Sequence, residues 1–237
     1  MNVVVLTGAG ISQESGIPTF RGSDGLWEGQ RVEEVASPEG FAANPDLVHE
    51  FYNARRRQLQ QDSVQPNAAH IALAEFELGW TRGKFCLITQ NVDDLHARAG
   101  SRNLIAMHGE LLKARCLDTC EVFPQRDNLT TQTPHPKRPE RLGRLRPHIV
   151  WFGEMPLAMD RIEAELLGCD LFVAIGTSGR VYPAAGFVLM TPPRCRKVEI
   201  NFEPTPVGSC FDEVIQGKAS IEVPKFFEYL FGSRQLS

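Results

Sequence analysis

Short apolar runs, separated by stretches with helical signals, set the architecture expected of this chain. The first run, Val3–Leu6, is rich in β-branched residues, as in a parallel strand that is covered on both faces. Similar runs occupy 85–88, 171–175 and 198–200, and residues 103–107 are a weaker candidate. Strands that alternate with helices predict an α/β fold with a doubly wound parallel sheet.

Helix boundaries are marked by proline, asparagine and glycine. Asn44 and Pro45 supply an N-cap side chain and a proline at the first helical position. Pro66 and Pro156 predict two further helix starts, and Gly168 predicts a stop after Leu167.

Two segments interrupt the alternation of strands and helices. Residues 31–78 are mostly helical with no clear strand, and residues 113–147 carry little periodicity. We expect these insertions to form a second, smaller domain that is mostly helical. The larger, Rossmann-like domain then comprises 1–30, 79–112 and 148–237. Doubly wound sheets bind ligands at the carboxyl ends of their strands, so the predicted cleft lies between that sheet edge and the insertions.

Bulk properties exclude several classes of protein. The net charge of −4 gives no reason to expect nucleic acid as a partner. No apolar stretch approaches the roughly 20 residues that cross a bilayer, and no basic segment or cleavage site precedes the first run, so we expect neither membrane nor secretory signal. The six cysteines are scattered, which favours a reducing cytoplasm over a disulfide scaffold.

A glycine-rich turn follows the first strand directly. Gly8-Ala9-Gly10-Ile11-Ser12 leads from that strand toward a helix, an arrangement that brings backbone N–H groups close to a phosphate. The next glycine is Gly16, so the spacing is not that of the dinucleotide fingerprint, and a tight turn without ligand is the alternative. A loop containing Phe20, Arg21 and Trp27 could close over a cofactor.

Polar side chains cluster after the strand at 85–88. Gln90, Asn91 and Asp93 would be costly there unless they are paired or bind something. Amides can hold ribose hydroxyls and a carboxamide, because each offers donors and an acceptor. His108 ends another strand-like stretch and is a natural general base near neutral pH. We interpret the other five histidines, His96 included, as structural.

Several motifs together resemble one family, the sirtuins. They occur in the family's order and span nearly the whole chain: Gly8–Ser12, Phe20-Arg21, Thr89–Asp93, His108-Gly109, Phe152–Glu154, Gly176–Ser178 and Asn201. The stretches 51–55 and 146–154 carry a closer likeness to the bacterial class III sirtuins, the NAD-dependent protein-lysine deacylases of the CobB type. The resemblance implies a deacylase for acetyl- and succinyl-lysine in proteins.

The resemblance also implies residue roles. His108 would be the general base, with Asn91 as a second catalytic residue. NAD would contact Gly8, Ala9, Gly10, Ile11, Ser12, Phe20, Arg21, Trp27, Gln90, Asn91, Val92, Asp93, Gly176, Thr177, Ser178, Asn201, Phe202, Glu203 and Ala219. The substrate peptide would pair as an added strand with Val150, Phe152, Gly153, Glu154 and Val181.

The implied reaction consumes NAD as a co-substrate. The acyl-lysine oxygen would attack the anomeric carbon of the nicotinamide ribose, and nicotinamide would leave. His108 would then help to deprotonate a ribose hydroxyl, which attacks the imidate carbon. Water completes the transfer and gives free lysine and O-acyl-ADP-ribose.

Tyr52 and Arg55 lie three residues apart on an expected helix, so both face the same side. Arginine binds a carboxylate in a bidentate manner, and the resemblance implies that this pair recognises succinyl, malonyl or glutaryl groups. The alternative is that Arg55 is solvated beside Arg56 and Arg57.

The chain departs from the family at its zinc site. Cys116 and Cys120 are present, but no cysteine lies between Glu121 and Leu145, and His135 is the other soft ligand nearby. A structural zinc needs four ligands, so we do not expect one here. The other cysteines are interpreted as structural.

Three alternative functions stay open. A mono-ADP-ribosyltransferase would share the NAD chemistry, although Tyr52 and Arg55 make sense only with an acidic acyl chain. A Rossmann oxidoreductase is disfavoured by the glycine spacing. A non-catalytic NAD-sensing or peptide-binding module is disfavoured by the joint presence of His108, Asn91 and Asp93.

Overall fold

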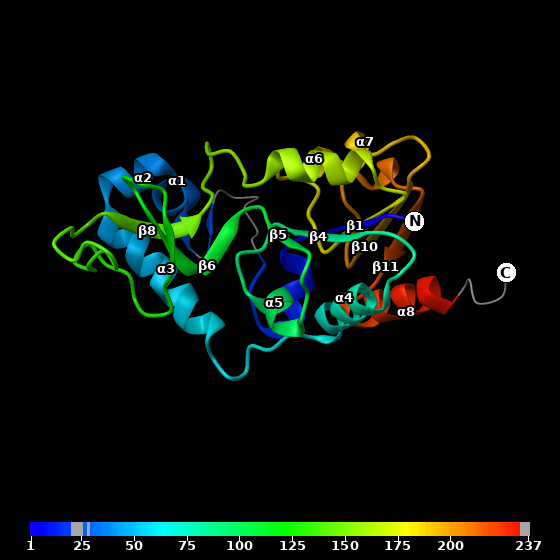
Figure 1. Cartoon of the computed structure of the whole chain (residues 1–237), viewed down its shortest axis with the longest axis horizontal. Coiled ribbons are helices and arrows are strands. Elements are labelled where there is room, and N and C mark those ends of the chain that lie inside the picture. The colour runs from blue at the N-terminus through cyan, green and yellow to red at the C-terminus, as the bar shows by residue number, and fades with distance from the viewer. Residues whose placement is uncertain (20–25, 28, 233–237) are drawn as a thin grey trace.

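A six-stranded parallel sheet forms the centre of the molecule (Figure 1). The computed structural model describes residues 1–19, 26–27 and 29–232, and for 26–27 the backbone alone. The strand order is β11 (Glu213–Gln216), β10 (Arg196–Asn201), β9 (Leu171–Ile175), β1 (Val3–Thr7), β4 (Phe85–Thr89) and β5 (Leu104–Ala106). The doubly wound α/β fold is therefore confirmed, and each strand expected from the sequence is present.

Alternate residues of β1 face opposite layers. Val3 and Val5 belong to the core beneath α4 (Ala68–Gly79) and α8 (Ala219–Gly232). Val4 and Leu6 belong to the opposite core, which includes residues of α6 (Met159–Leu167) and α7 (Phe187–Met190). Figure 1 shows α6 and α7 on one face of the sheet and α4 and α8 on the other. Because both faces are covered, the strand is buried at every position and apolar from Val3 to Leu6.

Capping side chains set the helix boundaries. The Asn44 side chain accepts from the Leu47 N–H at 3.1 Å at the start of α3 (Pro45–Leu59), as predicted. Asn67 caps α4, whose first residue, Ala68, lies two residues after the start predicted at Pro66. The helix predicted from Pro156 begins only at Met159, because Ala158 has a left-handed backbone with φ 56°. Its last residue is Leu167, and Gly168 caps it, as predicted.

The second part of the molecule contains a sheet as well as helices. Three antiparallel strands lie in the order β7 (Val122–Pro124), β6 (Gly109–Cys116) and β8 (Leu145–Ile149). The helices α1 (Val32–Val35), α2 (Pro38–Ala43) and α3 accompany them at the same end (Figure 1). The predicted domain boundaries stay a prediction, and α4, which they assign to the smaller part, packs against α8 beneath the large sheet.

Short elements complete the description. They are the 3-10 helices η1 (Ala9–Ser15), η3 (Ala184–Gly186) and η4 (Gly208–Cys210), the helix α5 (Leu95–Ala99), and the two-stranded β2 (Leu26–Trp27) and β3 (Gln30–Arg31). Within the described ranges, every helix is too short or too polar to span a membrane.

Buried histidines predict an acid-sensitive fold. Burial lowers the pKa of His49 and of His70 to about 4. The folded state therefore binds fewer protons than the unfolded state between pH 6.5 and 4, and stability falls as the pH falls through this range. Asp93 opposes the trend, since burial raises its pKa to about 6. We expect the net effect of the histidines to win, so that the thermal midpoint drops between pH 7 and pH 5.

The measurement is thermal denaturation across that pH range. His49→Gln removes one of these titrating histidines and should make the profile less steep. A midpoint that is constant or rises on acidification would contradict the assignment of these histidines as neutral in the folded state.

Candidate active site

The predicted site residues follow neighbouring strands at one edge of the parallel sheet. Gly8–Ser12 follow β1, 90–93 follow β4, His108 lies two residues after β5, 176–178 follow β9 and 201–203 follow β10. Ala219 begins α8, just after β11. Parallel strands end on the same side, so segments far apart in sequence meet at this edge.

Glycines allow two of these segments to touch through their backbones. The Gly10 N–H donates to the Gly176 carbonyl at 2.9 Å. A Cβ at Gly8 would lie 2.8 Å from the Gly176 oxygen, and a Cβ at Gly10 would lie 2.8 Å from the Gly176 Cα. Gly176 itself has φ +61°, and its Cβ would lie 2.4 Å from the Ile11 nitrogen. Glycine is therefore required at all three positions for this approach.

Gly176→Ala should damage both stability and NAD binding. The new methyl group would meet backbone atoms in a left-handed conformation, which costs about 1–3 kcal/mol in strain and pushes the two loops apart. We expect a lower thermal midpoint and weaker NAD binding by calorimetry. Gly153→Ala is a matched control, because Gly153 also has a positive φ but its Cβ would meet open space. Equal effects of both substitutions would contradict the close-approach argument.

The glycine turn is a 3-10 helix, and part of its backbone is already bonded. The N–H groups of Gly8, Gly10 and Ile11 donate to the carbonyls of Ile175, Gly176 and Gly8. A phosphate at this turn would therefore find fewer N–H groups available for hydrogen bonds than a turn that leads directly into an α-helix would offer. The Ile11 side chain is fully buried in the core, so this residue can contribute only backbone atoms to a ligand.

Asn91 fastens the end of β4 to the glycine turn. Its side-chain NH2 donates to the Gly8 carbonyl at 3.1 Å and to the Ser12 hydroxyl at 3.2 Å. Ser12 in turn donates to the Asp93 carboxylate at 2.9 Å. Four predicted cofactor residues, Gly8, Ser12, Asn91 and Asp93, therefore form one hydrogen-bonded unit.

The Asp93 carboxyl group has a pKa well above the usual value for an aspartate. Its second oxygen accepts from the Leu95 N–H at 3.1 Å at the start of α5. Burial raises the pKa of Asp93 to about 6, and the hydrogen bonds from Leu95 and Ser12 offset part of that rise. Such a group at the carboxyl edge of the sheet is a candidate ligand for a polar amide.

His108 is oriented with one ring nitrogen available as a base. Its Nδ1 lies 2.9 Å from the Gln90 carbonyl oxygen. A carbonyl only accepts, so Nδ1 carries the proton and Nε2 keeps its lone pair. Burial lowers the pKa of His108 from its ordinary value, with partial compensation by the Gln90 bond. The imidazole is therefore neutral, and able to accept a proton, at pH 7.

A histidine pair beneath the site was not predicted to contact it. His70 and His96 are buried, with ring centroids 4.8 Å apart. His70 Nε2 lies 3.4 Å from the Ser12 hydroxyl, and His96 Nε2 lies 3.0 Å from the Thr7 hydroxyl. The sequence held one signal for His70: it stands three residues after the N-cap Asn67, and its Nδ1 accepts from the Asn67 N–H.

At the far end of the sheet edge, Asn201 connects the loops after β10 and β9. Its side-chain NH2 donates to the Thr177 carbonyl at 2.6 Å. Phe202 is 61% exposed beside it, although large aromatic side chains are usually covered. An exposed ring next to bonded loops suits stacking against a planar ligand.

The predicted peptide-binding segment uses much of its backbone internally. The N–H groups of Val150, Phe152 and Glu154 donate to the carbonyls of His108, Ala36 and Trp151. An added strand would therefore have to use other backbone groups of this segment or of the loop around Val181. Phe152 is half exposed, whereas Trp151 is buried.

Tyr52 and Arg55 lie on α3, as the sequence predicted. Tyr52 is fully buried, and its phenol oxygen accepts from the Trp151 indole N–H at 3.0 Å. The Arg55 guanidinium lies 3.2 Å from the centre of the Phe51 ring. Tyr52 therefore reaches the residue that precedes Phe152.

Phe20 and Arg21 lie outside the described residues, as does the side chain of Trp27.

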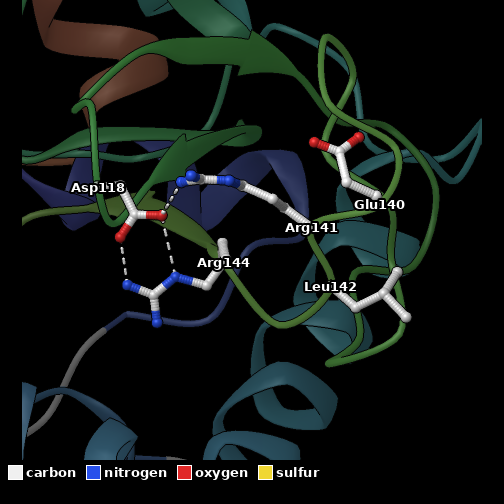
Figure 2. Close-up of a pocket in the computed structure, with 5 residues that line it drawn as sticks. All are labelled: Asp118, Glu140, Arg141, Leu142 and Arg144. Atoms are coloured by element: carbon white, nitrogen blue, oxygen red, sulfur yellow. Dashed lines mark hydrogen bonds and ion pairs between the residues drawn. The ribbon is translucent and has the colours of Figure 1, made fainter.

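The loop between β6 and β8 does not fit a closed zinc site. Cys116 is buried, whereas Cys120 is exposed. Across the ranges that the structure describes, no three His, Cys, Asp or Glu side chains are grouped to hold a metal. Figure 2 shows the arrangement of this loop: the Asp118 carboxylate accepts two hydrogen bonds from Arg144 and one from Arg141. These side chains line a pocket of about 410 Å³.

Asp118→Ala should loosen this loop, whereas a chelator should not. Removing the carboxylate releases both guanidinium groups, so we expect faster proteolytic cleavage within residues 116–145. Glu140→Ala is the matched control, because Glu140 lines the same pocket, and Figure 2 draws no hydrogen bond or ion pair from it to Asp118, Arg141 or Arg144. Accelerated cleavage of the wild type by a chelator, or a full equivalent of zinc in protein purified without added metal, would contradict this account.

Comparisons with known proteins agree with the geometry. A family model described as "Sir2 family" matches residues 8–183. An NAD-dependent protein deacylase of Rhodopirellula baltica is 58% identical over 235 residues, which cover 97% of this chain and 98% of the relative. A mutant Sir2 homologue in complex with ADP-ribose superposes with a TM-score of 0.87 at 42% identity, covering 99% of this chain and 94% of that chain. A Sir2 homologue in complex with NAD gives a TM-score of 0.85 at 41% identity, covering 98% and 90%.

Proposed function

The chain belongs to the Sir2 family, and we propose that it removes both acetyl and succinyl groups from protein lysines with NAD as co-substrate. NAD-dependent protein deacylation is the activity of the relative that matches along 97% of the chain. The observation that carries the proposal is the convergence of the predicted NAD and base residues on one sheet edge. An oxidoreductase or a binding module would not need a neutral His108 beside that edge.

NAD fits the sheet edge at both of its ends. Gly8, Gly10 and Gly176 bring no Cβ to the place where the two loops touch, which suits a pyrophosphate close to the backbone. The exposed Phe202 ring and Asn201 suit an adenosine. Asn91 and Asp93 suit the ribose and the carboxamide of nicotinamide, because the amide oxygen and the carboxylate can accept from hydroxyl and amide N–H groups.

His108 acts as the general base in this proposal. NAD supplies the ribose to which the acyl group is transferred and the nicotinamide that leaves. The Nε2 of His108 takes the proton from a ribose hydroxyl, because its Nδ1 is committed to the Gln90 carbonyl. Asn91 holds the glycine turn and the Ser12–Asp93 pair in register, so that the ribose is presented in one orientation.

The acyl group lies against Tyr52 and Arg55 on α3. A carboxylate in the pocket gains charge-assisted hydrogen bonds from the guanidinium and the phenol. The Tyr52–Trp151 bond connects this pair to the segment around Phe152, which is expected to hold the substrate peptide. Acylated protein lysines are thus the partners; the chain's net charge of −4 favours neither nucleic acid nor an anionic membrane. The free thiols fit a reducing cytoplasm.

A competition experiment tests the substrate class. Equal amounts of acetyl- and succinyl-lysine peptides of one sequence are incubated with the protein and NAD, and both are followed by mass spectrometry. The proposal predicts NAD-dependent loss of both acyl groups. Loss of acetyl alone would remove the acidic-acyl assignment. Transfer of ADP-ribose to an unmodified peptide, with no deacylation, would favour the ADP-ribosyltransferase alternative.

A further inference from the structure

A buried carboxyl group lies on β10, two residues before Asn201, and has no part in the proposed reaction. Glu199 is 1% exposed, although glutamate is rarely buried this completely. Its Oε1 accepts from the Thr205 hydroxyl at 2.7 Å and from the Asn201 side-chain NH2 at 3.4 Å. Across the part of the chain that the structure describes, no donor reaches its Oε2. Burying an unpaired polar atom costs free energy, so this carboxyl group points to a role other than stability.

The two side chains that Glu199 binds connect the loop after β10 to the loop after β9. The Asn201 amide also donates to the Thr177 carbonyl at 2.6 Å. Thr205 lies against the same loop, because a Cβ at Gly179 would lie 3.4 Å from the Thr205 Cβ and 3.5 Å from its hydroxyl. Glu199 therefore holds together the two loops at which we place the adenosine of NAD.

These contacts determine how the Asn201 amide is turned. The Thr177 carbonyl can only accept a hydrogen bond, and the Glu199 Oε1 accepts as well, so the nitrogen of the amide must face both oxygens. The amide oxygen of Asn201 is then the atom that remains for a ligand. An oxygen acceptor suits a ribose hydroxyl, and an acceptor that is already oriented loses less entropy on binding.

We propose that Glu199 is a positioning residue for the adenosine ribose of NAD: it orients the Asn201 amide and fixes the loop 201–208, so that an acceptor meets a ribose hydroxyl. This inference rests on the proposed function, because it names what orders the adenosine end of the same NAD site. Glu199 acts through Asn201 and Thr205 and does not touch the cofactor itself. It therefore sets the affinity for NAD and not the rate of the chemical step.

Glu199→Met tests the proposal, because it removes both carboxyl oxygens and keeps the length of the side chain. We expect the Kd for ADP-ribose, measured by calorimetry, to rise about tenfold as the amide loses its fixed orientation. KM for NAD should rise by a similar factor, and kcat should change little. The thermal midpoint should hold or rise, since an apolar group replaces a buried polar group that lacks a donor. A merely structural role would lower stability and binding together.

Two further variants serve as controls. Glu199→Gln keeps an oxygen acceptor for Thr205 and Asn201, so it should bind ADP-ribose nearly as tightly as the wild type does. Glu213→Met removes the same group from the amino end of the neighbouring strand β11, where Glu213 is exposed and pairs with Arg196. This variant should leave ADP-ribose binding as it is.

Thr205→Val provides a second test should Glu199→Met not fold. Thr205 is only partly buried, and valine keeps its shape without the hydroxyl, so ADP-ribose binding should weaken by a smaller factor. Combined with Glu199→Met, it should add little, because both act through one contact. Unchanged ADP-ribose binding in either folded variant, or equal weakening by Glu199→Gln, would overturn the inference. A wild-type protein that does not bind ADP-ribose would instead remove the proposed NAD site, and this inference with it.

Discussion

His108→Ala should abolish nearly all deacylation while leaving NAD binding intact. A positioned general base contributes about 10²–10⁴-fold to a rate, and the Nδ1–Gln90 bond directs the basic nitrogen away from the backbone. We therefore expect kcat to fall by that factor at saturating NAD and peptide. The imidazole is only partly buried, so the variant should fold, with a thermal midpoint close to that of the wild type.

His135→Ala is the control for the loss of a histidine as such. His135 is buried in the segment between β7 and β8, with its ring 5.0 Å from the Phe123 ring, and it belongs to none of the loops that follow the parallel strands. We expect this variant to retain its turnover. A folded, NAD-binding His108→Ala variant with wild-type turnover would remove His108 from the mechanism.

Arg55→Met should separate two activities of one pocket. Methionine keeps the length of the side chain but loses the guanidinium, and with it up to two charge-assisted hydrogen bonds to a distal carboxylate. Each is worth about 1.5–3 kcal/mol, so desuccinylation should fall by roughly 100-fold or more in kcat/KM. Deacetylation should change far less, since acetyl offers no carboxylate.

Arg57→Met is matched in chemistry and lies on the same helix. The Arg57 side chain is half exposed and forms an ion pair with Glu50 at 2.9 Å. Because Arg57 lies five residues after Tyr52, the two side chains leave the helix on different faces. It should leave both activities as they are. Equal losses of desuccinylation and deacetylation in Arg55→Met would indicate that Arg55 supports the helix and does not read the acyl group.

The strands that were predicted share one property. Strands β1, β4 and β9 are buried at every residue, so covering by helices on both faces left a continuous apolar signature. Strand β11 escaped prediction because it lies at the sheet's edge and is mostly exposed. Its sequence, Glu-Val-Ile-Gln, is too short and too polar to be told from a loop.

Strand β8 escaped prediction for the opposite reason. All five residues of Leu145–Ile149 are buried, but three of them are arginine, proline and histidine, which favour no strand. Arg146 can be buried only because Glu154 neutralises it. That pairing is a tertiary contact between residues eight apart, and no local pattern announces it.

The site residues also differ in whether a local sequence pattern or only a tertiary contact reveals them. The placement of Gly8, Asn91 and His108 at the sheet edge could be predicted, because each lies within two residues of the end of a parallel strand. The hydrogen bonds that organise them, such as His70 to Ser12, join segments about sixty residues apart and required the fold. The contact of Trp151 with Tyr52, across ninety-nine residues, is of the same kind.

In the proposed reaction the acyl group leaves lysine and is transferred to the ADP-ribose of NAD. The most direct test is mass spectrometry of one succinyl-lysine peptide incubated with the protein, with and without NAD. The account predicts free lysine peptide, nicotinamide and O-succinyl-ADP-ribose in equal amounts, and only when NAD is present. Peptide that stays succinylated in a folded, NAD-binding protein, or release of free succinate without NAD, would contradict it.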